Sequence, residues 1–147
     1  MVNKFDTKRL DDALGNDSAA AVTELIRLVI KGDIDAMVML SVFWIGQPSD
    51  DLYLKGVKLL EVAAGKGNPE AQWRLGSIYL YGDRTIEPNV DIGLQWLERA
   101  SKANFAWAKV NLADHYAGLG DSESMAKANA LYEEASILGL NRTALTL

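Results

Sequence analysis

The sequence contains no cysteine, only 3 prolines in 147 residues, and no long apolar run. The absence of cysteine excludes a disulfide framework, thiolate chemistry and a zinc knuckle. No run approaches the roughly 18 apolar residues of a membrane span. Residues 1–14 are charged throughout and lack the apolar stretch of a signal peptide. We therefore expect a cytoplasmic protein with no membrane span and no cleaved signal.

Groups suited to catalysis or metal binding are also scarce. Histidine occurs once, as His115, where packing is a commoner role than catalysis. One histidine with scattered carboxylates does not supply three or four convergent metal ligands. The acidic pairs at 50–51 and 133–134 would point about 100° apart on a helix, which suits solvated faces better than an acid–base dyad. Residues 118–121 lack the strand and the spacing of a phosphate loop. We expect no enzyme activity, no cofactor and no metal.

Acidic side chains outnumber basic ones by 20 to 15, which gives a net charge of −5. This balance argues against nucleic acid as a partner, because nucleic-acid binding needs a basic surface that displaces counterions. It also argues against binding to an anionic membrane. An acidic surface tends to favour a basic protein partner, although the same charge is ordinary for solubility.

Residues 68–104 contain the signals of two helices joined by a loop. Asn68 is a good N-cap, and Pro69 suits the first helical position, where its missing N–H costs nothing. Apolar residues then recur at helical spacing, and Gly82 ends the helix. Asn89 can cap the second helix. Glycines on both apolar stripes, at positions 76 and 93, predict that the two backbones approach closely.

The same pattern recurs before and after this stretch. A small residue begins each first helix, at intervals of 35 and 37 residues: Ala36, Ala71 and Ala108. A leucine and then an aromatic residue follow at steps of four: Leu40, Leu75 and Leu112, then Trp44, Tyr79 and Tyr116. The closing residues are Gly32, Gly67, Asn104 and Gly139. We expect the stripe residues to be buried and the closing residues to have positive φ.

The pattern resembles the Sel-like repeat family (the Sel-one type), a branch of the tetratricopeptide-like helical repeats. The family signature is approximately A-x-x-x-L-G-x-x-Y-x-x-G, a loop, then A-x-x-W-x-x-x-A-A-x-x-G. The second repeat keeps most of these positions: Ala71, Leu75, Gly76, Tyr79, Gly82, Trp96 and Ala100. The first repeat has Ser41 at the family's glycine, and the third has Leu131 where Trp96 stands.

The resemblance covers about residues 33–141 and implies an all-α fold, an α-α superhelix of about seven or eight helices. We expect one domain over residues 1–147. Its parts would be a degenerate N-terminal capping repeat, three repeats and a C-terminal tail, at residues 1–32, 33–67, 68–104, 105–139 and 140–147. Within the capping repeat, residues 6–14 could form a short helix.

By the same resemblance, the first helices of the hairpins line a concave groove that binds another protein. The implied groove residues of the second and third repeats are Glu70, Trp73, Arg74, Ser77, Tyr81, Trp107, Asn111 and Asp114. The first repeat would add Asp35, Val38 and Val42. Trp73 and Trp107 do not stand at family consensus positions. Each could either contact a partner or fill a gap between successive hairpins.

These observations predict a non-enzymatic protein–protein interaction module, such as an adaptor. The alternative is a bacterial immunity protein that occludes the active site of a cognate toxin or effector. That alternative follows from small size, acidic charge and family habit. An enzyme or a small-ligand binder is a third reading, and the missing catalytic groups argue against it. The oligomeric state is unknown from the sequence.

Overall fold

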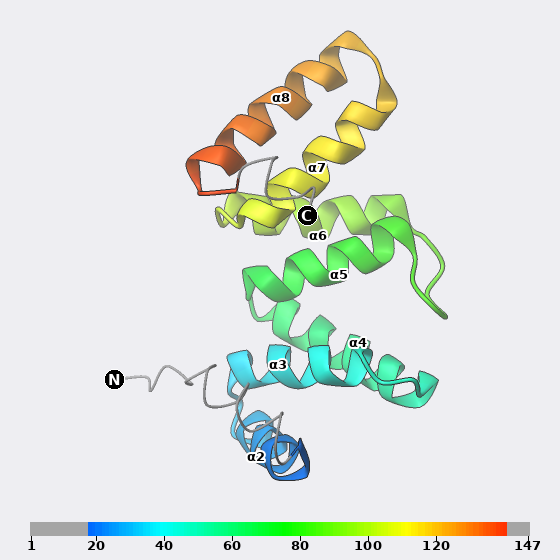
Figure 1. Cartoon of the computed structure of the whole chain (residues 1–147), viewed down its shortest axis with the longest axis vertical. Coiled ribbons are helices and arrows are strands. Elements are labelled where there is room, and N and C mark those ends of the chain that lie inside the picture. The colour runs from blue at the N-terminus through cyan, green and yellow to red at the C-terminus, as the bar shows by residue number, and fades with distance from the viewer. Residues whose placement is uncertain (1–17, 141–147) are drawn as a thin grey trace. The chain divides into compact units, whose positions relative to one another are not determined.

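The computed structural model describes residues 18–140, which form seven α-helices joined by short connections (Figure 1). They are α2 (Ser18–Ile30), α3 (Ile34–Ile45), α4 (Asp50–Gly65), α5 (Pro69–Tyr81), α6 (Val90–Lys102), α7 (Ala106–Leu119) and α8 (Ser122–Ile137). These residues contain no β-strand, only an isolated antiparallel bridge between Asp83 and Ile86 in the α5–α6 loop. The all-α prediction is confirmed. The predicted helix at 6–14 and the tail at 141–147 lie outside the described residues.

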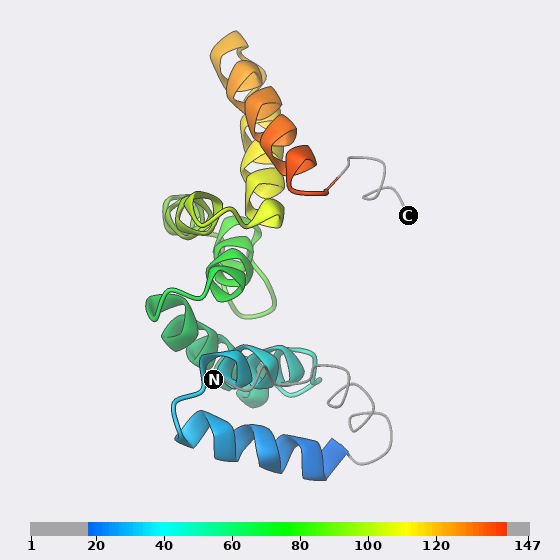
Figure 2. The same ribbon diagram turned by 90° about the vertical axis from the view of Figure 1, so that its left-hand side faces the viewer.

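The helices group into two compact units that divide between Asn68 and Pro69. In the first unit, α2 lies alongside α3 and α3 packs against α4 (Figure 2). The second unit contains two hairpins, α5/α6 and α7/α8, with α6 packed against α7 and α5 also touching α7. The division falls where the second repeat was predicted to begin. The single domain expected over the whole chain stays a prediction.

Side-chain caps begin four of the described helices. Each cap oxygen accepts a hydrogen bond from a first-turn amide that has no partner within the helix. The pairs are Asp33 with Ala36, Ser49 with Leu52, Asn89 with Ile92, and Asp121 with Ser124. The capping role predicted for Asn89 is confirmed. At α8 the Ser124 hydroxyl also donates to Asp121, and these hydrogen bonds hold the pKa of Asp121 below its usual range.

The closing residues all adopt the left-handed conformation, with φ of 86° at Gly32, 92° at Gly67, 59° at Asn104 and 95° at Gly139. After each of them the next amide donates to a carbonyl five residues back, as in a Schellman motif. Its acceptors are the carbonyls of Leu28, Ala63, Ala100 and Ala135. The register predicted from the sequence is therefore confirmed.

The connection between α7 and α8 consists of only two residues, Gly120 and Asp121. Helix α7 continues through Leu119, and Gly120 alone of this connection is left-handed, with φ of 77°. Asp121 follows at once as the cap of α8. Because one left-handed residue and a cap suffice to reverse the chain, Gly118 stays helical.

The predicted stripes of alanine and leucine form the interior of both units. Exposure is at most 3% at these positions: Ala36, Ala71, Ala108, Leu40, Leu75 and Leu112. The aromatic residues four positions further on are only half-buried. The predicted close approach of α5 and α6 is confirmed, because a Cβ on Gly93 would lie 2.6 Å from the backbone nitrogen of Leu80. In the first unit, a Cβ on Gly56 would lie 2.8 Å from the Ser41 carbonyl oxygen.

Lys109 is a buried cation in the second unit, with 5% of the residue exposed. Its ammonium lies 2.6 Å from Glu134 Oε2 on α8 and 3.5 Å from the Ser101 hydroxyl on α6. The residues at the same register position, Met37 and Gln72, are also buried. Lys109 therefore joins three helices by polar contacts at a position that α3 fills with an apolar side chain.

Candidate protein-binding surface

The residues predicted for the groove in the second and third repeats lie along α5 and α7 of the second unit. They recur at helical steps of three and four, which place them in stripes on one face of each helix. The two helices touch, and hydrogen bonds link their stripes. We call this set the α5–α7 surface: Glu70, Trp73, Arg74, Ser77, Tyr81, Trp107, Asn111 and Asp114.

Asn111 on α7 is the polar centre of the α5–α7 surface. Its Oδ1 accepts a hydrogen bond from Trp73 Nε1 at 3.2 Å. Its Nδ2 donates to the Ser77 hydroxyl at 3.1 Å, and that hydroxyl donates to the Trp73 carbonyl at 3.0 Å. One amide on α7 thus engages two residues of α5, Trp73 and Ser77, and fixes the two stripes against each other.

An aromatic cluster covers the beginning of the surface. The Trp73 ring lies 5.5 Å from that of Phe105 and 6.1 Å from that of Trp107, measured between centroids. Trp73 is half-buried and packs against the core of the second unit, whereas Trp107 remains 36% exposed. Trp73 therefore fills space between the two hairpins, and Trp107 presents more of its ring to solvent.

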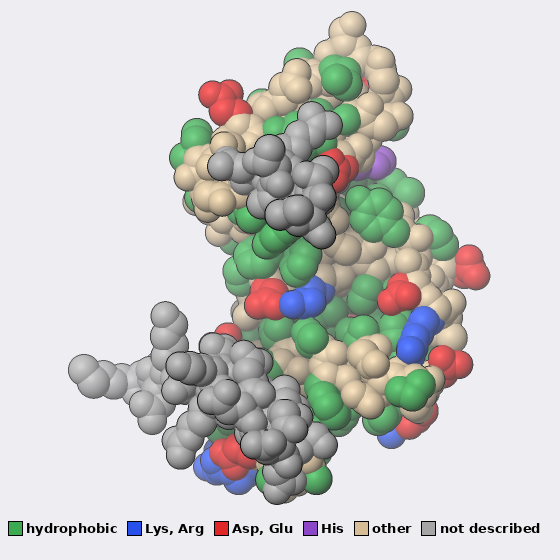
Figure 3. Space-filling model, in the orientation of Figure 1, with side chains coloured by type: hydrophobic (Ala, Val, Ile, Leu, Met, Phe, Trp, Pro, Cys, Tyr) green, Lys and Arg blue, Asp and Glu red, His purple; other side chains and the backbone are tan. Residues whose placement is uncertain are grey.

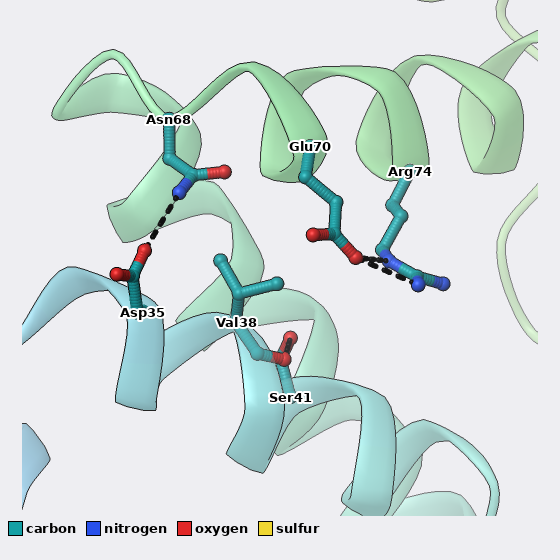
Figure 4. A network of polar contacts seen from close by, with 6 residues as sticks. All are labelled: Asp35, Val38, Ser41, Asn68, Glu70 and Arg74. Atoms are coloured by element: carbon teal, nitrogen blue, oxygen red, sulfur yellow. Dashed lines mark hydrogen bonds and ion pairs between the residues drawn. The ribbon is translucent and has the colours of Figure 1, made fainter. Parts of the chain in front are cut away.

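Arg74 lies over the Trp73 ring. It is also paired with Glu70 one turn earlier, as Figure 4 shows. The guanidinium carbon is 5.1 Å from the Trp73 ring centroid, and Arg74 Nε donates to Glu70 Oε1 at 2.9 Å. A partly exposed pair of this kind contributes little to stability. Its effect is to hold the planar guanidinium against the indole and to balance the charge of Glu70.

The far end of the surface carries an exposed tyrosine and a carboxylate. Tyr81 is 57% exposed, and Asp114 accepts a hydrogen bond from the Tyr132 hydroxyl on α8. Partial burial raises the pKa of Tyr81, the charge of Asp114 raises it further, and the hydrogen bond from Asn111 acts in the opposite direction. Among the described residues, Asp114 makes no ion pair. No cation among them balances the charge of Asp114, which acts on the phenol groups of Tyr81 and Tyr132.

Two residues of this region escaped the sequence prediction. Phe105 follows Asn104 at the end of a Schellman motif, where a hydrophobic contact is common. That position was a usable signal. Tyr132 occupies the register position of Leu60 and Leu97, which are fully buried. A tyrosine at a leucine position was the second signal, because its hydroxyl needs a polar partner.

The positions predicted in the first repeat have different surroundings within the first unit. Asp35 Oδ1 accepts a hydrogen bond from Asn68 Nδ2 at 3.5 Å (Figure 4). Val38 is 4% exposed and Val42 37% exposed. Ser41, which replaces the family's glycine, is fully buried and donates to the Val38 carbonyl at 2.6 Å. These residues form no aromatic or hydrogen-bonded counterpart of the α5–α7 surface.

The face shown in Figure 3 carries mostly hydrophobic and uncharged side chains over α5 and α7, with isolated acidic and basic ones between them. His115 is half-buried, and its ring meets that of Tyr116 edge-on at 5.6 Å. In the part of the chain that the structure describes, no three acidic or histidine side chains gather as metal ligands. Within residues 18–140, none of the helices has both the length and the apolar character needed to cross a membrane.

The Sel1 repeat family matches this chain at residues 69–105 and 108–140, which are the two hairpins of the second unit. A Sel1 repeat protein from Oxalobacter formigenes is similar in structure, with a TM-score of 0.67 and 29% identity over 84% of this chain and 93% of that one. A protective antigen of uropathogenic Escherichia coli with an SLR fold has a TM-score of 0.76 and 22% identity over 84% of this chain.

This chain spans only 27% of the length of the Escherichia coli antigen, so that likeness concerns the fold alone. No curated protein matches the chain in sequence. The two matched repeats coincide with hairpins that the periodicity had predicted, and both solved structures are built from repeats of the same kind. The second unit therefore contains two Sel1 repeats, and the chain has the fold of Sel1-repeat proteins.

Proposed function

We propose that this chain is a non-enzymatic binding module that receives a segment of another protein on its α5–α7 surface. Sel1 repeats are generally protein-interaction modules. The observation that carries the proposal is the exposure of Trp107 and Tyr81, at 36% and 57%, on a surface held together by Asn111. Tryptophan, tyrosine and arginine most often dominate the binding energy of protein interfaces.

The fixed geometry of this surface favours recognition of a partner. Holding side chains in place before binding reduces the conformational entropy that the complex must otherwise lose. Trp73 is locked by its hydrogen bond and by packing against Phe105, so it supports Trp107 as a rigid backing. The proposal covers an adaptor and a toxin inhibitor alike, since either would hold its partner through such a surface.

The proposal is tested by using the chain as bait in extracts of its native cells. Trp107→Ser and Tyr81→Ser remove the two exposed aromatic rings. Ile137→Ser is the matched control, because Ile137 is 78% exposed on α8 and lies outside the α5–α7 surface. We expect the wild type and Ile137→Ser to retain the same partner, and both surface variants to lose most of it.

Thermal melts of the same variants separate binding from folding. We expect all three to melt within a few degrees of the wild type, because exposed substitutions usually change stability by no more than about 0.5 kcal/mol. A partner that is retained equally by Trp107→Ser and Tyr81→Ser would contradict the proposal. Loss of capture by Ile137→Ser alone would place the binding surface on α8 instead.

A further inference from the structure

Within residues 18–140, the carboxylate of Asp114 is the charged group of the α5–α7 surface that has no cationic partner. The other acid of the surface, Glu70, is paired with Arg74. On α8, the lysine nearest the α7 aromatic residues, Lys127, is paired with Glu123 and lies over the Tyr116 ring. Asp114 instead accepts a hydrogen bond from the Tyr132 hydroxyl, which orients the carboxylate without neutralising its charge. An exposed and oriented anion of this kind is suited to a cation from outside the chain.

Tyr81 gives the same place an aromatic wall. Its ring is 57% exposed, and its hydroxyl lies near Asn111 and Asp114. An arginine or lysine side chain can lay its aliphatic carbons on such a ring while its charged end reaches the carboxylate. Arginine has the further advantage of a planar fork that can bind a carboxylate through two parallel hydrogen bonds.

We propose, on the basis of the function proposed above, that Asp114 and Tyr81 bind an arginine or lysine side chain of the partner segment, while Trp107 contacts an apolar residue of it. Trp107 and Asp114 are seven positions apart on α7, which places them on one face about 10 Å apart along the helix. An extended segment covers this distance in about three residues. The recognised motif therefore has an apolar and a basic residue about three positions apart.

The test is selection of a random dodecapeptide library on the whole chain, followed by affinity measurements on synthetic copies of the selected peptides. We expect the peptides to be enriched in arginine or lysine about three positions from an apolar residue. Asp114→Asn should weaken their binding roughly five-fold, the effect of an exposed ion pair. Glu98→Gln removes one negative charge from an exposed position of α6 and should leave the affinity unchanged.

A thermodynamic cycle identifies the contact itself. Replacing the peptide's arginine by citrulline keeps its shape and removes its charge. We expect citrulline to weaken binding to the wild type roughly five-fold and to have no further effect on Asp114→Asn. If the two effects multiply, or if the selected peptides lack basic residues, Asp114 is not the acceptor and the inference is wrong.

The same experiment distinguishes failure of this inference from failure of the proposed function. Peptides that bind the wild type and lose affinity with Trp107→Ser, but are indifferent to Asp114→Asn, support the α5–α7 surface and overturn the basic motif. Peptides that bind Trp107→Ser as tightly as the wild type overturn both proposals. A library that yields no binder counts against both as well.

Discussion

The α3/α4 hairpin of the first unit and the two hairpins of the second unit have interiors of the same kind. They differ in the residues on the exposed face of their first helices. Buried alanine and leucine recur in all three, and a glycine lets the helices approach closely in the α3/α4 and α5/α6 hairpins. At equivalent outer positions, however, α3 has Asp35 and Val42 where α7 has Trp107 and Asp114. The interior residues of the repeat define the hairpin, and the outer residues of the first helix are available for recognition.

The largest effect is expected from removing the central leucine of a hairpin. Leu40 and Leu75 are 1% and 0% exposed at equivalent positions of the two units. Leu75→Ala and Leu40→Ala should each lower the free energy of unfolding by about 2–5 kcal/mol, through lost transfer energy and a cavity. Urea denaturation measures both losses. A loss below about 1 kcal/mol in either variant would show that the equivalent leucines do not contribute equally to the interiors of the two units.

The close helix approach is tested by adding one methyl group to a glycine. A Cβ on Gly93 would lie 2.6 Å from a backbone atom of α5, so Gly93→Ala should destabilise the chain by about 1–3 kcal/mol despite better helix propensity. In the first unit, Gly56→Ala should act in the same direction.

Gly118→Ala is the matched control for the close approach. Gly118 is also helical, but a Cβ there meets nothing within 4 Å. We expect a gain of about 0.4–1 kcal/mol, because alanine restricts the unfolded chain more than glycine does. Thermal melts compare the three variants. The same sign for Gly93→Ala and Gly118→Ala would mean that α5 and α6 can separate without cost.

The buried Lys109 distinguishes α7 from α3, which has Met37 at the same position. Glu134→Ala leaves the Lys109 ammonium buried without its carboxylate and should cost about 1–3 kcal/mol. Lys109→Met introduces the residue type that α3 has at Met37 and should be neutral or stabilising, because an apolar side chain avoids the desolvation of the pair. Urea denaturation distinguishes the two outcomes. A larger loss in Lys109→Met than in Glu134→Ala would show that the pair is strongly stabilising.

The smallest of these effects concerns the one closing residue that is not glycine. Asn104 has φ of 59°, so Asn104→Ala places an alanine in the left-handed region and should cost about 1 kcal/mol. Asn104→Gly gives this hairpin the same closing residue as the others and should change the free energy of unfolding by only a few tenths of a kcal/mol. Melting temperatures of the two variants provide the measurement. Equal temperatures would indicate that the strained φ relaxes.

The parts of the fold that depend on residues close together in the sequence were predictable. The closing residues need positive φ, and the buried stripes follow the helical period, so both could be located in the sequence. The burial of Lys109 was not predicted, because a lysine at helical spacing usually faces solvent. The division of the chain at Asn68 was not predicted either, because the repeat pattern continues across it without a change in composition.

The residues of the α5–α7 surface are those that the family resemblance implied for the groove, whereas their contacts with one another were not predicted. Hydrogen bonds such as those from Trp73 to Asn111 and from Tyr132 to Asp114 depend on side-chain rotamers and on the angle between helices. A repeat pattern specifies neither quantity. The sequence therefore left both interpretations of Trp73 open, and the structure shows its packing role.

The claim that recognition belongs to the α5–α7 surface is tested most directly by the indole N–H signals of the chain's 4 tryptophans in a two-dimensional NMR spectrum. Trp44 and Trp96 occupy repeat positions outside this surface, whereas Trp73 and Trp107 belong to it. On titration with a captured partner or a selected peptide, we expect the signals of Trp73 and Trp107 to shift and those of Trp44 and Trp96 to stay in place. Shifts confined to Trp44 or Trp96 would contradict the account.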